Sequence, residues 1–288
     1  MQRPSGASAI RIAPYTAPVR RRRTRTVRRW AAFAAITAAV ALAAGCGGDE
    51  LDAAAEPDPP VGSPVLPDLA PKPQYNVLTQ QVGNRWRIRF TTTIVNVGEG
   101  PFILRATRFP GAEWRAEQDV AYTESGAEQM HVGSVLVWGG DGHEHWHVER
   151  VAVVRLVPVD DDGKARVGAK ALVDTKVGFC FYDHTHELAR GPEERAYSAK
   201  SCGTKDSTAV GMGLSPGWND TYLMGLPGQS IDVTDLPDGR YRLFTDIDPQ
   251  KRFREASRSN NRTWIDLQLR RTGTGLAAPT VATGPTPS

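Results

Sequence analysis

The sequence has few cysteines and lacks the common phosphate-binding motifs. Three of its 288 residues are cysteine, so it can form no more than one intramolecular disulfide. No P-loop and no GxGxxG stretch is present, which leaves nucleotide and dinucleotide binding without support. Apolar stripes with helical spacing longer than about three turns are absent, as are internal repeats. Helical and repeat architectures are therefore disfavoured.

Acidic residues and lysine are absent from the first 45 residues, which hold nine arginines instead. When these nine positive charges are set aside, the formal net charge of +3 becomes −6 for the residues from Cys46 onward. Nucleic-acid binding is disfavoured, because the positive charge that would neutralise phosphates lies in a segment that we expect to be removed.

This arginine-rich leader has the features of an export signal. Trp30 to Ala44 is a run of fifteen uncharged, mostly apolar residues, which is the length of a signal h-region and too short to span a membrane. The small residues before Cys46 resemble the lipobox of bacterial lipoproteins, in which the cysteine is lipidated. We therefore expect a lipid anchor at Cys46 on the outer face of a bacterial cell membrane. An ordinary signal peptide and secretion are the alternative, and Arg28-Arg29 does not decide the export route.

The remaining chain divides by composition into a linker, a domain and a tail. Residues 46–73 include an acidic, proline-rich stretch with few large apolar side chains, so we expect an extended tether. Residues 74–270 are long enough for one domain with a sizeable core. Residues 271–288 are also poor in large apolar side chains, and we expect a disordered tail.

Within residues 74–270 the hydrophobic pattern has a period of two. The clearest alternating stretches are Trp86–Phe90, Ile231–Val233 and Tyr241–Ile247, and Val148–Val157 and Thr263–Leu269 are predicted to be further strands. Glycine and proline separate them, as in the Pro237-Asp238-Gly239 turn. The stretch from Gly213 to Tyr222 is predicted to be a tight loop feeding a strand rather than a nucleophile elbow. This pattern predicts an all-β fold, an antiparallel β-sandwich with long loops.

Export also bears on the two cysteines of the predicted domain. Outside the cytoplasm, a pair of thiols is more often a disulfide than a metal or catalytic site. We therefore predict a disulfide between Cys180 and Cys202, which would stabilise the fold by about 3 kcal/mol in the chain-entropy model.

Three histidines with alternate spacing form the most informative cluster. His143, His145 and His147 would place their imidazoles on one face of a strand. Imidazole binds copper, zinc, nickel and iron, and three histidines are costly to bury without partners, so metal binding is favoured over a structural role. On a flat strand the outer two Cβ atoms would be about 13 Å apart. The segment must bend if all three bind one ion, and the glycines that precede it permit a bend.

Other histidines and nearby carboxylates give weaker signals. His184 and His186 are interpreted as surface or loop residues, and His131 as a structural histidine. A zinc hydrolase would need a catalytic carboxylate beside the histidine cluster. Glu144 and Glu149 are present, but Glu144 alternates onto the opposite face of the strand. A zinc hydrolase is therefore the least favoured of the functions considered.

Several stretches in order resemble the catalytic domain of the lysyl oxidase family. They are the H-x-H-x-H run at 143–147, Lys176–Cys180 (KVGFC), Gly213–Gly217 (GLSPG) followed by Asp220–Tyr222 (DTY), and Ile231–Thr234 (IDVT) before Asp238–Tyr241 (DGRY). The Pro249 and Ser259-Asn260-Asn261 signals are also similar. The resemblance covers most of residues 74–270 and is strongest from His143 onward.

This resemblance implies the identity of the site residues. Members of the family are copper amine oxidases with a lysine tyrosylquinone cofactor made from a lysine and a tyrosine of the chain. Carried over by motif, the Cu(II) ligands are His143, His145 and His147, and the quinone precursors are Lys176 and Tyr222. Cofactor formation would require an unprotonated lysine amine, and burial or a nearby cation would lower its pKa accordingly.

The implied reaction uses molecular oxygen to convert a primary amine into an aldehyde, with hydrogen peroxide and ammonia as further products. The amine would be a small molecule or a peptidyl lysine. Asp220 is the candidate base, because it lies two residues before Tyr222 and shares its face of a strand. The alternative is a non-catalytic copper-binding lipoprotein on the same scaffold.

The sequence also departs from the animal members of the family. Animal domains carry several disulfides, whereas this chain can form one. Lys176 and Tyr222 are separated by a stretch that includes an expanded loop over residues 187–207. The arrangement of loops around the site is therefore expected to differ.

Overall fold

The predicted strand segments form β-strands in the computed structural model of the protein, except that Val233 follows the end of its strand. The structure describes residues 59–109, 111, 113–133, 136–139, 144–164, 173–273 and 275–288, and for residues 173–176 it describes only the backbone. Cys46 and the leader lie outside the described residues, as does His143. All described residues belong to one unit, Glu56–Ser288.

The described residues form strands of two to thirteen residues and one short helix. The strands are β1 (Pro64–Val65), β2 (Leu69–Pro71), β3 (Tyr75–Val82), β4 (Arg85–Asn96), β5 (Phe102–Arg108), β6 (Trp114–Tyr122), β7 (Ala127–His131), β8 (Leu136–Trp138), β9 (Trp146–Pro158), β10 (Val173–Phe179), β11 (Thr185–His186), β12 (Ala209–Leu214), β13 (Trp218–Tyr222), β14 (Ser230–Asp232), β15 (Gly239–Ile247), β16 (Arg262–Thr272), β17 (Gly275–Ala277) and β18 (Thr280–Thr283). A 3-10 helix, η1, spans Ala199–Cys202.

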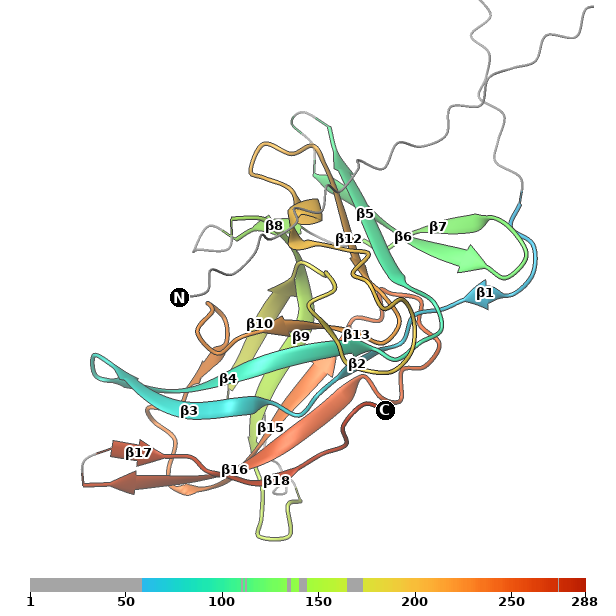
Figure 1. Ribbon diagram of the computed structural model, residues 1–288. Coiled ribbons are helices and arrows are strands. Elements are labelled where there is room, and N and C mark those ends of the chain that lie inside the picture. Colours follow the sequence, from blue (N-terminus) through green and yellow to red (C-terminus); the bar gives the residue numbers. More distant parts are fainter. Residues whose placement is uncertain are drawn as a thin grey trace, which may run out of the picture. The chain divides into compact units, whose positions relative to one another are not determined.

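These strands form three antiparallel sheets, which confirms the prediction of an all-β antiparallel fold. The first sheet has the order β1-β6-β5-β12, with β7 beside β6. The second has the order β10-β9-β15-β16-β17, with β8 beside β9 and β18 beside β16. The third has the order β11-β13-β4-β14, and β2 and β3 also pair with β4. Figure 1 shows the β3–β4 hairpin crossing the direction of the β9–β15–β16 sheet.

The buried side chains come from all three sheets and form one core. Aromatic rings fill its centre, where Phe102 packs against Phe181 and Phe253 with ring centroids 4.7 and 4.9 Å apart. All three rings are almost fully buried. Burial of this size dominates the stability of such a domain, and it anchors the loop after β10 to the sheets.

The prediction of an extended tether over residues 46–73 is wrong for its last part, which contains β1 and β2. Strand β1 pairs with β6, and β2 pairs with β4. Leu69 and Ala70 are buried, and a Cβ atom on Gly100 would lie 2.1 Å from the carbonyl oxygen of Val65. Proline-rich segments can therefore serve as short edge strands here, since an edge strand needs only part of its N–H groups.

The expected disordered tail over residues 271–288 is also wrong. Strand β18 pairs with β16 opposite Ile265 to Leu267, and the amide of Gly284 donates to the carbonyl of Trp264 at 2.7 Å. Backbone pairing along an open strand edge does not require large apolar side chains. Composition alone therefore underestimated the order of this segment.

Within the described part of the chain, no helix is long and apolar enough to cross a membrane.

Candidate active site

The histidine cluster begins between β8 and β9 and continues into β9. Trp138 of β8 pairs with Trp146 of β9, and the amide of Gly139 donates to the carbonyl of His145 at 3.1 Å. His145 immediately precedes β9, and His147 is the second residue of that strand. His143, the first histidine of the cluster, lies outside the described residues.

The two described histidines of this cluster lie side by side. The ring centroids of His145 and His147 are 4.7 Å apart, and the rings are nearly perpendicular. His147 is largely buried, with 8% of its surface exposed. With metal–nitrogen bonds of about 2 Å, two imidazoles on one ion have centroids about 4 to 5 Å apart. The pair therefore fits a shared metal ion, and imidazole donors suit copper.

Two side chains do not by themselves make a complete metal site. Among the described residues, no three histidine, cysteine, aspartate or glutamate side chains are grouped so that they could hold a metal ion. The third predicted ligand, His143, lies outside those residues. The assignment of all three histidines as ligands remains a prediction.

Strand β10 passes close to His147. A Cβ atom built on Gly178 would lie 3.1 Å from the Cβ of His147 and 3.2 Å from the carbonyl oxygen of Val148. Because glycine has no Cβ, the two strands can approach closely here. Lys176 lies two residues earlier on β10, where its backbone pairs with Val153. Its side chain is outside what the structure describes.

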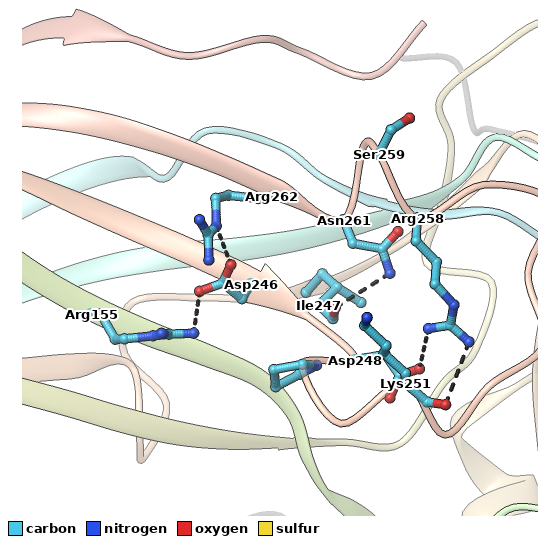
Figure 2. A pocket seen from close by; sticks show the side chains of 10 residues that line it. Arg155, Asp246, Ile247, Asp248, Lys251, Arg258, Ser259, Asn261 and Arg262 are labelled. Atoms are coloured by element: carbon cyan, nitrogen blue, oxygen red, sulfur yellow. Dashed lines mark hydrogen bonds and ion pairs between the residues drawn. The ribbon is translucent and has the colours of Figure 1, made fainter.

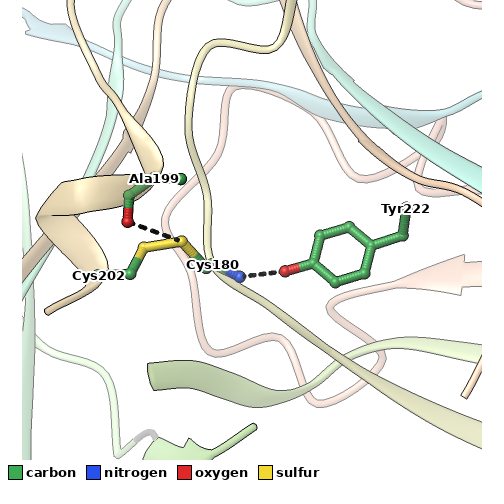
Figure 3. Close-up of a disulfide and its surroundings, with 4 residues drawn as sticks. All are labelled: Cys180, Ala199, Cys202 and Tyr222. Atoms are coloured by element: carbon green, nitrogen blue, oxygen red, sulfur yellow. Dashed lines mark hydrogen bonds between the residues drawn. A yellow bond between two sulfur atoms is a disulfide. The ribbon is translucent and has the colours of Figure 1, made fainter. Parts of the chain in front are cut away.

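Tyr222, at the end of β13, packs against both β9 and β10. Its ring centroid is 5.9 Å from that of His147 and 4.3 Å from that of Phe179. The backbone amide of Cys180 donates to the Tyr222 hydroxyl at 2.9 Å (Figure 3). Burial, together with the negative charge of Asp220, raises the pKa of the Tyr222 phenol well above its ordinary value. The phenol is therefore held in a fixed position, in its neutral form.

Asp220 shares the buried face of β13 with Tyr222. Its side chain has no solvent exposure, and burial raises the pKa of its carboxyl group well above the ordinary value, with a further increase from nearby Asp183. Its interaction with the Thr221 amide lowers the pKa and is smaller than the effect of burial. A carboxyl group that retains a proton at higher pH is suited to acid–base chemistry near neutrality.

The predicted disulfide is present. Cys180 and Cys202 are bonded, with Cα atoms 6.0 Å apart and a sequence separation of 22. Both cysteines are fully buried. The disulfide joins the end of β10 to η1, so it fixes the residue whose amide holds the Tyr222 hydroxyl (Figure 3).

Tyr182 belongs to this site, although the sequence patterns did not indicate it. The chain from Cys180 to His184 runs beside β13, since the amide of His184 donates to the carbonyl of Asn219 at 2.8 Å. Tyr182 lies between these two contacts, and burial and the charge of Asp220 raise the pKa of its phenol. The KVGFC stretch ends two residues before it. No local sequence pattern beyond that stretch marks Tyr182 as a residue of the site.

The other three histidines are not part of this cluster. His184 and Thr185 share a hydrogen bond of 3.0 Å. The His186 ring contacts the Arg190 carbonyl at 2.9 Å and stacks on Trp218. His131 is an exposed residue of β7.

The Gly213–Gly217 segment also forms a turn rather than a nucleophile site. It connects β12 to β13, and Ser215 is buried. The Ser215 hydroxyl donates to the carboxylate of Asp183 at 2.9 Å. This serine therefore has a structural role in holding the β12–β13 turn.

Comparison with known proteins places these residues in a family context. The family model described as lysyl oxidase matches residues 141–277. The protein-lysine 6-oxidase of Gallus gallus is 29% identical over 195 residues, which cover 67% of this chain and 36% of that protein. The enzyme of the same name from Rattus norvegicus is 39% identical over 132 residues, or 46% of this chain and 28% of that protein. The one from Sus scrofa is 27% identical over 132 residues, or 46% and 45%.

The matches therefore span less than half the length of each of these three relatives. The family match includes the histidine cluster, β10 and β13.

Proposed function

Because the chain belongs to the lysyl oxidase family, we propose that it is a copper- and quinone-dependent oxidase of primary amines. It would convert a primary amine and molecular oxygen into an aldehyde, hydrogen peroxide and ammonia. The observation that carries this proposal is the contact of the Tyr222 ring with the His147 ring, at 5.9 Å between centroids. That contact places a residue of the histidine cluster next to the tyrosine that the family resemblance indicates as the quinone precursor.

His143, His145 and His147 would hold the copper ion in this proposal. Lys176 and Tyr222 would be joined as lysine tyrosylquinone. When present, copper supplies a redox-active centre and the quinone supplies an electrophilic carbonyl for the amine. The chain itself fixes the tyrosine, because Phe179 packs on its ring and the Cys180 amide holds its hydroxyl.

Asp220 would remove the proton from the carbon next to the amine nitrogen. It is fully buried on the same face of β13 as Tyr222. A base in this position must retain its proton until the product leaves, and the raised pKa of its carboxyl group suits that task. Burial also excludes bulk water, which would otherwise compete for the proton.

Lys176 would reach the tyrosine from β10, which belongs to a different sheet from β13. Its position is three residues before Phe179, which contacts the Tyr222 ring. Three residues of a β-strand span about 10 Å. For the two residues to be joined, the Lys176 side chain must therefore extend along the end of β10 toward Tyr222.

The substrate would be a primary amine, either a small molecule or the side chain of a peptidyl lysine. A formal charge of −6 from Cys46 onward favours cationic partners by long-range attraction. Lipidation at Cys46 would hold the enzyme on the outer face of the cell membrane, and secretion without an anchor is the alternative.

Mass spectrometry of protein matured with copper and oxygen tests this proposal. A crosslinked peptide that joins Lys176 to Tyr222 is the expected result, together with peroxide release from a panel of primary amines. Lys176→Ala is expected to abolish both signals. Lys205→Ala, a substitution at an exposed lysine of the loop after η1, is the matched control and should leave both unchanged.

The same experiment separates the enzyme from the alternative function. Two unmodified peptides in a protein that retains copper would favour a copper-binding surface lipoprotein. Peroxide release that survives Lys176→Ala would contradict the assignment of the cofactor.

A further inference from the structure

A cavity of about 410 Å³ lies on the second sheet, apart from the residues of the candidate active site. Its walls come from β9, β15, β16 and the connection between β15 and β16. His145, His147, Asp220 and Tyr222 are not among its lining residues. Its size is within the range of small-molecule sites.

The lining of this cavity is unusually basic for this chain. Four cationic side chains line it, namely Arg155, Lys251, Arg258 and Arg262, against the two carboxylates of Asp246 and Asp248. The formal balance of the lining is therefore +2, whereas the chain from Cys46 onward has a formal charge of −6. A local reversal of sign attracts anions to this position.

Both carboxylates already have two arginine partners. Asp246 forms an ion pair with Arg155 at 2.6 Å and another with Arg262, and Figure 2 shows the two arginines flanking it. Asp248 lies 3.1 Å from Arg258 and 3.8 Å from Arg252. Each carboxylate is nearly or fully buried. These acids are therefore saturated, and the cavity offers no open carboxylate to a cation.

Two cationic groups in the lining retain unused donors. Arg262 uses only its Nε atom in the ion pair with Asp246, and its side chain is 57% exposed. No described residue accepts a hydrogen bond from the Lys251 ammonium group. The backbone of Lys251 is nevertheless fixed, because its amide donates to the Asp248 carbonyl at 2.9 Å. A charged donor on a fixed backbone is suited to ligand binding.

We propose that this cavity binds an oxyanion, either a carboxylate or a phosphate group of a small ligand. Arg262 would offer its two terminal nitrogens to two oxygens of the anion, and Lys251 would add a point charge from the other side. Guanidinium groups match the geometry of both anions, and such charge-assisted bonds are stronger than neutral ones. An anion would also reduce the net positive charge of the lining. The site is independent of the proposed amine oxidation.

Calorimetric titration of the full chain with sodium phosphate, and separately with disodium succinate, tests the proposal. Ionic strength is kept constant with sodium chloride. Saturable binding of phosphate alone would identify a phosphate site, and saturable binding of succinate would identify a carboxylate site. Lys251→Gln and Arg262→Gln are each expected to weaken binding roughly tenfold, which corresponds to about 1.4 kcal/mol.

Arg270→Gln is the matched control, since Arg270 is an exposed residue of β16 outside the cavity lining. It removes the same charge and should leave the affinity unchanged. Lys251→Gln breaks no described ion pair, so its effect does not depend on a change in folding. Absence of saturable binding for both anions, or equal weakening by Arg270→Gln, would overturn the proposal.

Discussion

The backbone amide of Cys180 donates a hydrogen bond to the hydroxyl of Tyr222 at 2.9 Å. Cys180 is also one half of the disulfide to Cys202. The chain thus couples its one described disulfide to the tyrosine that we propose as the cofactor precursor. A change in the disulfide is therefore expected to reach the site through a single backbone group.

Replacement of both Cys180 and Cys202 by serine is expected to lower the free energy of unfolding by about 3 kcal/mol, because the loop between them is no longer closed in the unfolded chain. The yield of the Lys176 to Tyr222 crosslink should fall as well, since the Cys180 amide loses its anchor. Urea unfolding gives the first quantity and peptide mapping the second. A stable variant with full crosslink yield would show that the disulfide does not position Tyr222.

Gly178→Ala is expected to disturb the histidine cluster. The new Cβ atom would lie 3.1 Å from the Cβ of His147 and would push the strands apart. We expect weaker copper binding by several-fold and a stability loss of about 1 kcal/mol. Calorimetric titration with copper measures the first effect.

Gly211→Ala provides the comparison for this prediction. A Cβ atom at Gly211 of β12 would meet nothing within 4 Å. This variant should bind copper like the unsubstituted protein. Equal copper affinity in the two variants would argue against a role for the His147 position in metal binding.

Strands such as β15 were predictable because one of their faces is buried. In β15, Tyr241, Leu243 and Thr245 are buried, and the residues between them are half-exposed. Such alternation is visible in the sequence. The two strands near the end of the sequence, β17 and β18, could not be predicted from such alternation. β17 and β18 are short, and their pairing with β16 uses the backbone. The amino-acid composition of a segment does not indicate such backbone pairing.

The site was predictable in its local part only. His145 and His147 are two residues apart, so their proximity follows from strand geometry. The contact between His147 and Tyr222 joins two different sheets, and only the resemblance to a family indicated it. Tyr182 was missed because its position depends on the path of the chain beside β13, which no local pattern encodes.

Asp220→Asn is expected to reduce peroxide release by roughly 10²- to 10⁴-fold, which is the usual contribution of a general base. Copper content and crosslink yield should stay near those of the unsubstituted protein, because the amide has nearly the same shape as the carboxyl group. Steady-state rates and peptide mapping on the same sample measure these quantities. Full activity in the variant would assign the base to another residue.

Glu255 makes the stability of the fold dependent on pH. Burial raises the pKa of its carboxyl group from 4.5 to about 7, against the lowering effects of hydrogen bonds from Asn261 and the Leu69 amide. Between pH 4.5 and about 7 the folded chain therefore holds a proton that the unfolded chain has lost. This group's contribution to the free energy of unfolding falls as the pH rises through that window, by up to about 3 kcal/mol.

Glu255→Gln is expected to remove this contribution, because the amide does not ionise. The free energy of unfolding should then decline less between pH 5 and pH 8 than it does in the unsubstituted protein. Urea unfolding at a series of pH values measures both slopes. The amide keeps one oxygen that can accept from the Leu69 amide, which donates to Glu255 at 2.8 Å, but it loses the acceptor of the hydrogen bond from Asn261. That loss is the same at every pH, so it shifts the free energy of unfolding without changing its slope. Identical slopes in the two proteins would mean that the Glu255 carboxyl group has the same pKa in the folded and unfolded chains.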